Sequence, residues 1–231
     1  MRSLSAAGDL LLGAGCHGCG RPGWGVCATC RDELAGRTAY RTTPVPVPPG
    51  FPVTVTSSPY DPLVRRLVIA HKERQALSLA GLLGERLARS VDGLLDLTAH
   101  PADRPVVLVP VPSARRAVRE RGLDATRALA RAAARRSAHG ARVTVVGALA
   151  QARTVRDQAG LSAADRQRNL AGGFRLRRSV DGVAVVVVDD VVTTGSSLTE
   201  AVRVLEAAGT RVLGAATVAA TVRLRTPHGC R

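Results

Sequence analysis

The sequence contains few aromatic residues, one lysine and no long apolar run. Phe, Trp and Tyr make up 2% of the 231 residues, too few for the extended base-stacking surface that single-strand binding proteins use. No run reaches the roughly 18 apolar residues of a membrane-spanning helix, so we expect no membrane insertion. Of the 33 basic residues, 32 are arginine and the other is Lys72. This arginine bias weakens the formal charge of +15 as evidence for a polyanionic partner.

A convincing export signal and a convincing nucleotide-binding motif are also missing from the sequence. The first residues mimic an export signal, but Asp9 interrupts their short apolar stretch and only Arg2 precedes it. We therefore expect a cytoplasmic protein. No G-x-x-x-x-G-K pattern occurs, and the G-x-G-x-x-G match at 13–18 neither follows a strand nor opens a helix, so neither nucleotide motif is supported.

Strand and helix patterns alternate along most of the chain. Helical patterns begin near residues 61, 79, 123 and 197, and strand patterns occupy 53–58, 105–112, 142–150, 174–178, 183–188 and 211–220. This alternation predicts an α/β fold with an open parallel sheet and flanking helices. In such sheets, ligands bind beyond the carboxyl ends of the strands.

Four cysteines form two C-x-x-C pairs separated by seven residues: Cys16, Cys19, Cys27 and Cys30. Two such pairs supply the four thiolates of a tetrahedral, structural Zn²⁺ site. A disulfide cluster is the alternative, but no other feature indicates an oxidising compartment. A proline-rich connector at 42–52 follows, which we interpret as a stiff linker. We therefore expect a zinc-ribbon-like module over 1–45 and a second domain over 46–231.

The stretch VVVVDDVVTTGSSL at 185–198 carries the clearest functional signal. Its four valines predict a buried strand, and Asp189 and Asp190 follow on opposite faces because side chains alternate along a strand. The turn that comes next opens a helix, whose free N–H groups suit a phosphate. Acids beside a phosphate turn favour a phosphorylated sugar as ligand. The alternative is an ordinary helix cap after an ordinary strand.

This stretch resembles the phosphoribosyl pyrophosphate (PRPP) signature of type I phosphoribosyltransferases. With the cysteine pairs, LVPVPSARRAVRERGLD and DQAGLSAADRQRNLAGGF in the same order, the chain resembles the ComF family, also called competence protein F homologues. The resemblance implies a type I phosphoribosyltransferase-like sheet preceded by a small zinc-binding module.

The resemblance also assigns residues to the parts of PRPP. It implies that Asp189 and Asp190 are the catalytic acids and contact ribose, and that Mg²⁺ accompanies PRPP. It places the 5′-phosphate on Thr193, Thr194, Gly195 and Ser196, and pyrophosphate on Ser113, Arg115, Arg116, Arg119 and Arg121. Further site residues by resemblance are Lys72, Gln158, Arg166 and Asn169. The family block R-G-F-N-Q lacks both amides here, at 121–125, which leaves the acceptor open.

Three functions remain open. The first is an enzyme that transfers ribose 5-phosphate from PRPP to a nitrogen acceptor. The second is a factor that handles single-stranded DNA, because the family is linked to competence and DNA uptake; single-stranded DNA and a competence helicase are then the candidate partners. Arg127, Arg131 and Arg135 recur at helical spacing and could follow a phosphate backbone, or form a solvated helix face. The third is a regulator that senses PRPP without turnover.

Overall fold

A mostly parallel sheet forms the centre of the computed structural model, which describes residues 15–73, 76, 78–114, 118–120, 122–152 and 172–221. The six strands lie in the order β1-β2-β8-β7-β3-β4. Their bounds are β1 Tyr40–Thr42, β2 Thr54–Thr56, β3 Val106–Pro110, β4 Val143–Val145, β7 Ala184–Val192 and β8 Val212–Ala220. Only β1 pairs antiparallel with its neighbour in this sheet. The expected α/β class with a parallel sheet is confirmed.

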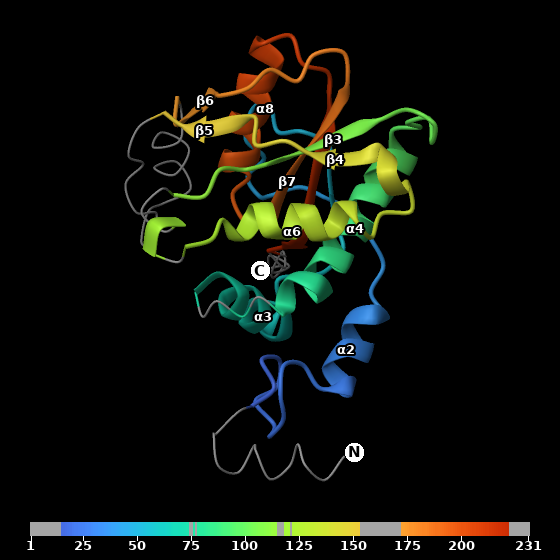
Figure 1. Ribbon diagram of the computed structural model, residues 1–231, viewed down its shortest axis with the longest axis vertical. Helices are drawn as coiled ribbons and strands as arrows, with labels where there is room; N and C mark the ends of the chain where they lie inside the picture. The colour runs from blue at the N-terminus through green and yellow to red at the C-terminus, as the bar shows by residue number, and fades with distance from the viewer. Residues whose placement is uncertain are drawn as a thin grey trace, which may run out of the picture.

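Helices cover both faces of the sheet (Figure 1). One hydrophobic core joins the sheet to α3 (Pro62–Glu73), α4 (Leu79–Leu97) and α6 (Ala125–Ala134). A second core joins the opposite face to α8 (Ser196–Ala207) and to a separate hairpin of β5 (Leu149–Gln151) and β6 (Phe174–Leu176). The shorter helix α2 (Ala28–Ala35) lies apart from the sheet, below α3 in Figure 1. Within these described ranges, no helix is both long and apolar enough to cross a membrane.

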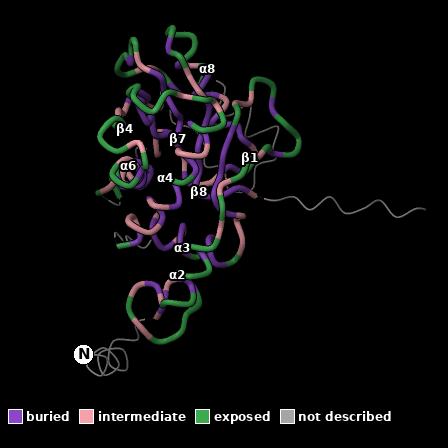
Figure 2. Tube along the Cα trace, turned by 90° about the vertical axis from the view of Figure 1, so that its right-hand side faces the viewer, coloured by how far each residue is buried: buried purple, intermediate pink, exposed green. Residues whose placement is uncertain are grey.

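The valine strand β7 is buried on both faces, as its continuous apolar run predicts. Val186 and Val188 belong to the core under α3, α4 and α6. Val185 and Val187 belong to the core under α8. Figure 2 shows the buried residues following β7, β8 and α4 through the middle of the molecule.

The sheet reverses its winding between β3 and β7. From β3 the chain continues through α6 to β4 at one edge, and from β7 it continues through α8 to β8 on the other side. In open α/β sheets the crevice at such a switch point, beyond the carboxyl ends of the strands, is where ligands bind. The fold therefore directs attention to the residues that follow Pro110 and Val188.

Two segments differ from the expected organisation. The expected strand at 142–150 is divided, because Val146 N donates to Leu108 O and Ala148 N then donates to Val146 O, which turns the chain away from the sheet. The connector at 42–52 is also more than a spacer. Pro44 and Phe51 lie against the turn that opens α8, at Gly195.

Candidate functional site

The two aspartates lie within the last residues of β7, at the carboxyl edge of the sheet. Asp190 shares its face with Val186 and Val188, toward α3. Asp189 shares its face with Val185 and Val187, toward the core under α8. The alternation predicted from the sequence therefore holds through the acidic pair, and the two carboxylates have different surroundings.

Asp190 forms an ion pair with Lys72 at the end of α3. Lys72 Nζ lies 2.6 Å from Asp190 Oδ2. Asp190 Oδ1 accepts a hydrogen bond of 2.8 Å from the N–H of Val191. Only 3% of Asp190 is exposed, so Lys72 Nζ is a cation placed directly against a buried carboxyl group.

Asp189 is half-buried, and no described residue forms an ion pair with it. Its Oδ1 accepts a hydrogen bond of 2.8 Å from the N–H of Asp190. Burial and the neighbouring charge of Asp190 raise the pKa of Asp189 to about 8, although Lys72 opposes the shift.

The turn after β7 has the geometry of an anion cradle. Gly195 has φ 78°, a left-handed conformation that glycine adopts without strain, and is the N-cap of α8. The first N–H groups of α8 have no partner inside the helix, and they carry its positive dipole end. The hydroxyl oxygens of Thr194 and Ser196 lie 3.0 Å apart beside them. Main-chain and hydroxyl donors thus gather a few residues beyond the acids.

Phe51 covers one side of this turn. A Cβ atom added at Gly195 would lie 2.5 Å from Phe51 Cε2 and 3.1 Å from Pro44 Cγ. Two constraints therefore require glycine at position 195: its left-handed backbone angle and the aromatic ring that lies against it. The connector that holds Phe51 lies far from Gly195 in sequence, so no local pattern indicated this contact.

The loop after β3 lies next to the acids because β3 and β7 are neighbours in the sheet, with Pro110 opposite Val188. Ser113 Oγ donates a hydrogen bond of 3.0 Å to Asp124 Oδ1. Arg119 is described and exposed. The other arginines assigned to this loop, Arg115, Arg116 and Arg121, lie outside the described residues, as do Gln158, Arg166 and Asn169.

Asp124 is a structural residue that the family resemblance presents only as a lost amide. Its side chain caps α6 by accepting from the N–H of Arg127 at 3.1 Å, and it binds Ser113 with the same oxygen. The capping role could have been found in the sequence, because an aspartate directly before a helical pattern is a standard signal of a helix start. The hydrogen bond to Ser113 could not have been found in the sequence.

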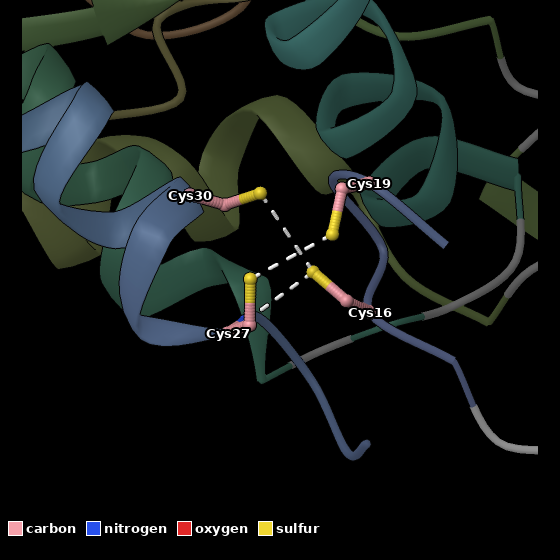
Figure 3. Close-up of side chains that lie close together, drawn as sticks. All are labelled: Cys16, Cys19, Cys27 and Cys30. Carbon is pink, nitrogen blue, oxygen red and sulfur yellow. Dashed lines mark hydrogen bonds between the residues drawn. The ribbon is translucent and has the colours of Figure 1, made fainter. Parts of the chain in front are cut away.

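The four cysteines of the two C-x-x-C pairs meet in one cluster, in which all four sulfur atoms lie within 4.8 Å of one another. Figure 3 shows their side chains turned toward a common centre. Cys16 Sγ lies 3.9 Å from Cys30 Sγ, and Cys19 Sγ lies 3.7 Å from Cys27 Sγ. Four sulfurs bound to one zinc ion at about 2.3 Å would lie about 3.8 Å apart, so this cluster fits structural zinc.

Backbone groups around the cluster favour a thiolate at Cys16. Cys16 Sγ accepts hydrogen bonds from the N–H of Gly18 at 3.3 Å and of Cys27 at 3.2 Å. Burial opposes ionisation of Cys16, but these backbone donors outweigh it and lower its pKa to about 6. Burial and the neighbouring sulfurs of the cluster instead raise the pKa of Cys30, which lies in the first turn of α2.

The cysteine cluster packs against α3. A Cβ atom at Gly18 would lie 2.7 Å from Leu63 Cδ1 and 2.8 Å from Cys30 Sγ, so only glycine permits this approach. Arg66 of α3 donates a hydrogen bond to the carbonyl of Gly18. The same helix carries Lys72 at its other end. One helix therefore contacts both the cysteine cluster and the acidic pair.

Comparison with known proteins agrees with this architecture. A family model described as a phosphoribosyl transferase domain matches residues 121–228. The DNA utilization protein YhgH of Salmonella typhi is 30% identical over 196 residues, covering 79% of this chain and 84% of the relative. The protein of that name from Escherichia coli strain K12 is 47% identical over 58 residues, covering 25% of this chain and 26% of the relative.

The matched domain and the sheet with its flanking helices define a protein of the phosphoribosyltransferase class. The four-cysteine cluster, which fits structural zinc, precedes that domain in the chain. Together with the relatives that span most of its length, these features identify the chain as a member of the ComF family.

Proposed function

We propose that the protein binds PRPP at the carboxyl end of β7 and transfers its ribose 5-phosphate to a nitrogen acceptor. One observation supports this most: the acids of β7 and the left-handed turn at Gly195 follow each other closely, at the switch point of the sheet. A pentose with a 5′-phosphate has the same arrangement of groups, with hydroxyls near one end and a dianion at the other.

Each part of PRPP then has its own protein groups. The 5′-phosphate binds the turn made by Thr193, Thr194, Gly195 and Ser196. The ribose lies at the acidic end of β7, which contains Asp189 and Asp190. The pyrophosphate lies over the loop after β3, which contains Ser113, Arg115, Arg116, Arg119 and Arg121. Gln158, Arg166 and Asn169 are assigned to the site by resemblance alone.

The reaction breaks the bond between ribose C1 and the pyrophosphate oxygen, and the electron pair leaves with pyrophosphate. Positive charge develops at C1, the nitrogen lone pair of the acceptor forms the new bond there, and the nitrogen then releases its proton to water. Guanidinium groups of the loop would stabilise the leaving group, and Mg²⁺ brought with PRPP would neutralise part of the same charge. The protein's part is to hold donor and acceptor in line and to stabilise this charge.

Calorimetric titration of the zinc-loaded full chain with PRPP and Mg²⁺ tests the proposal. We expect one site per chain, and we expect the double variant Asp189→Asn with Asp190→Asn to lose it while remaining folded. The matched control is Asp103→Asn, which changes an exposed aspartate in the loop before β3. Wild-type affinity in the double variant would contradict the ribose assignment, and no binding to wild-type protein would end the proposal.

Handling of single-stranded DNA is a second candidate, supported by the relatives and by exposed side chains. Relatives carry the name DNA utilization protein. Arg127, Arg131 and Arg135 are all exposed along α6, where they can reach a phosphate backbone. Trp24 beside the cysteine cluster is 63% exposed and offers a ring on which a base could stack.

A PRPP sensor without turnover is the third candidate, and it differs from the enzyme in one measurable respect. A sensor binds PRPP but releases no pyrophosphate. Assays of pyrophosphate release across a panel of bases and amines therefore separate the two.

A further inference from the structure

The two aspartates of β7 face different environments, which suggests that they do different work. Asp190 points toward α3, and both of its oxygens already contact protein groups: Val191 N at 2.8 Å and Lys72 Nζ at 2.6 Å. Only 3% of the residue is exposed. A carboxyl group buried to this degree beside a lysine is poorly placed to reach a ligand hydroxyl.

Asp189 is the more accessible acid. It is half-buried, and its Oδ1 accepts a hydrogen bond from the adjacent N–H of Asp190. Across the described ranges of the chain, no ion pair reaches it. It lies shortly before the turn at Thr194, on the strand face that leads toward α8. A sugar whose phosphate binds this turn would therefore meet Asp189 with its hydroxyls.

Lys72 is held in place by the rest of α3. Asp61 caps the start of the helix by accepting from the N–H of Val64 at 3.0 Å, and Arg37 lies 2.6 Å from the same aspartate. Arg66 binds the carbonyl of Gly18 beside the cysteine cluster. The buried face of α3 packs in the main core, so the ammonium group projects from a fixed support.

Lys72 is also the only lysine among 33 basic residues. A compact ammonium can approach one carboxylate oxygen from the end of a helix, whereas a guanidinium is a planar fork that requires more space and more acceptors. Its partner Asp190 is nearly inaccessible to water, so the geometry of this pair is demanding.

We propose that Lys72 is a positioning residue of the pentose subsite: it holds Asp190 in an internal ion pair on the α3 side of β7, and Asp189 alone contacts the hydroxyls of the sugar. The inference rests on the proposed function, because it assigns roles inside the same site. Without Lys72, the two adjacent carboxyl groups would lose the cation that compensates Asp190, and they would repel each other or share a proton. Asp189 would be displaced from the sugar as a result.

The test compares ribose 5-phosphate with inorganic phosphate as ligands of the zinc-loaded full chain. Phosphate measures the turn alone, and the difference between the two ligands measures the pentose contacts. We expect Asp189→Asn and Lys72→Met each to weaken ribose 5-phosphate binding by about tenfold or more and to leave phosphate binding unchanged. The double variant Lys72→Met with Asp190→Asn should regain most of the lost affinity, because no uncompensated charge remains.

Arg65→Met is the matched control, since it removes an exposed cation from the same helix. A purely structural role for Lys72 would weaken both ligands together, which would overturn the inference. If Asp190→Asn removed the pentose contribution and Asp189→Asn did not, the roles would be reversed and the inference wrong, while the proposed function would stand. If wild-type protein bound neither ligand nor PRPP, the proposed function would fail.

A second measurement tests the ion pair without any ligand. Denaturant unfolding of Lys72→Met, Asp190→Asn and the double variant forms a double-mutant cycle. We expect Lys72→Met to destabilise the protein, because it leaves the buried Asp190 carboxyl group without this cation, and we expect the double variant to be more stable than the sum of the two single changes predicts. Additive losses would overturn the positioning role of Lys72.

Discussion

Ser113 Oγ donates a hydrogen bond of 3.0 Å to Asp124 Oδ1, and through it the loop after β3 is attached to the first turn of α6. The same oxygen accepts from the N–H of Arg127. One carboxylate thus caps a helix and holds the loop to which we assign pyrophosphate. Asp124, which stands where the family block R-G-F-N-Q has an amide, therefore has a structural role in this chain.

Removing this carboxylate should affect stability and anion binding together. We expect Asp124→Ala to lower the free energy of unfolding by about 1 kcal/mol, the usual cost of losing an N-cap, and to weaken pyrophosphate binding because Ser113 is released. Asp124→Asn restores the amide of the family and should keep the cap. Denaturant unfolding and titration with pyrophosphate measure the two effects. If Asp124→Ala and the exposed control Asp103→Ala had the same free energy of unfolding and the same affinity for pyrophosphate, the hydrogen bond between Ser113 and Asp124 would have no function.

Substitution of Gly195 should cost more than its backbone angle alone explains. Gly209, at the other end of α8, has φ 79° and no atom within 4 Å of the place a Cβ atom would take, whereas Gly195 has φ 78° with Phe51 in contact. We expect both alanine variants to lose about 1 kcal/mol or more from left-handed strain. Gly195→Ala should lose more, because the ring must move. Equal unfolding free energies for Gly195→Ala and Gly209→Ala would show that the ring of Phe51 moves aside without a cost in stability.

The Asp189 carboxyl should make stability depend on pH. Its pKa in the folded protein is raised to about 8, above the value of about 3.9 for an unfolded chain. The folded state therefore binds this proton more tightly, so the contribution of the group is complete below the unfolded pKa and is lost as pH rises toward 8. We expect Asp189→Asn to gain stability relative to wild type between about pH 4 and about pH 8, the window that the two values define.

Unfolding midpoints of wild type and Asp189→Asn at a series of pH values measure this difference. The control is Asp181→Asn, an exposed aspartate in the turn before β7. A constant difference between wild type and Asp189→Asn across the series would mean that the Asp189 carboxyl has the same pKa in the folded and unfolded chain.

Metal analysis should find about one zinc ion per chain, because four sulfurs at these separations form one tetrahedral site. Cys16→Ser should release the metal and lower the unfolding midpoint, since the cluster packs against α3. Cys230→Ser is the matched control, because that thiol lies outside the two C-x-x-C pairs. Protein purified under reducing conditions without any metal would rule out the zinc site.

The α6 arginines provide the test of DNA handling. If they follow a phosphate backbone, changing Arg127, Arg131 and Arg135 together to Gln should weaken single-strand binding and reduce its dependence on salt concentration. Changing Arg175, Arg177 and Arg178, which are exposed around β6, is the control for lost net charge. Equal losses in both triple variants would assign the effect to overall charge and leave α6 as a solvated face.

The sequence by itself determined the local units of this protein. The spacing of the C-x-x-C pairs predicted a four-sulfur cluster, and the valine run predicted a strand buried on both faces; both are found. These features depend on residues close together in the chain, where backbone geometry limits the outcomes. The assignment of PRPP groups to particular residues, and the boundary at residue 45, stay predictions.

Tertiary structure alone decided which distant segments meet at the site. Lys72 and Asp190 are far apart in the sequence, and the family resemblance assigns Lys72 to the site but does not say which residue it contacts. The packing of α3 beside β7 brings Lys72 Nζ to 2.6 Å from Asp190 Oδ2. The contact of Phe51 with Gly195 and the division of 142–150 into two strands were likewise absent from any local pattern. Such contacts depend on how helices and strands pack against one another, because the shape of the whole core, rather than the preference of one segment, sets which side chains face each other.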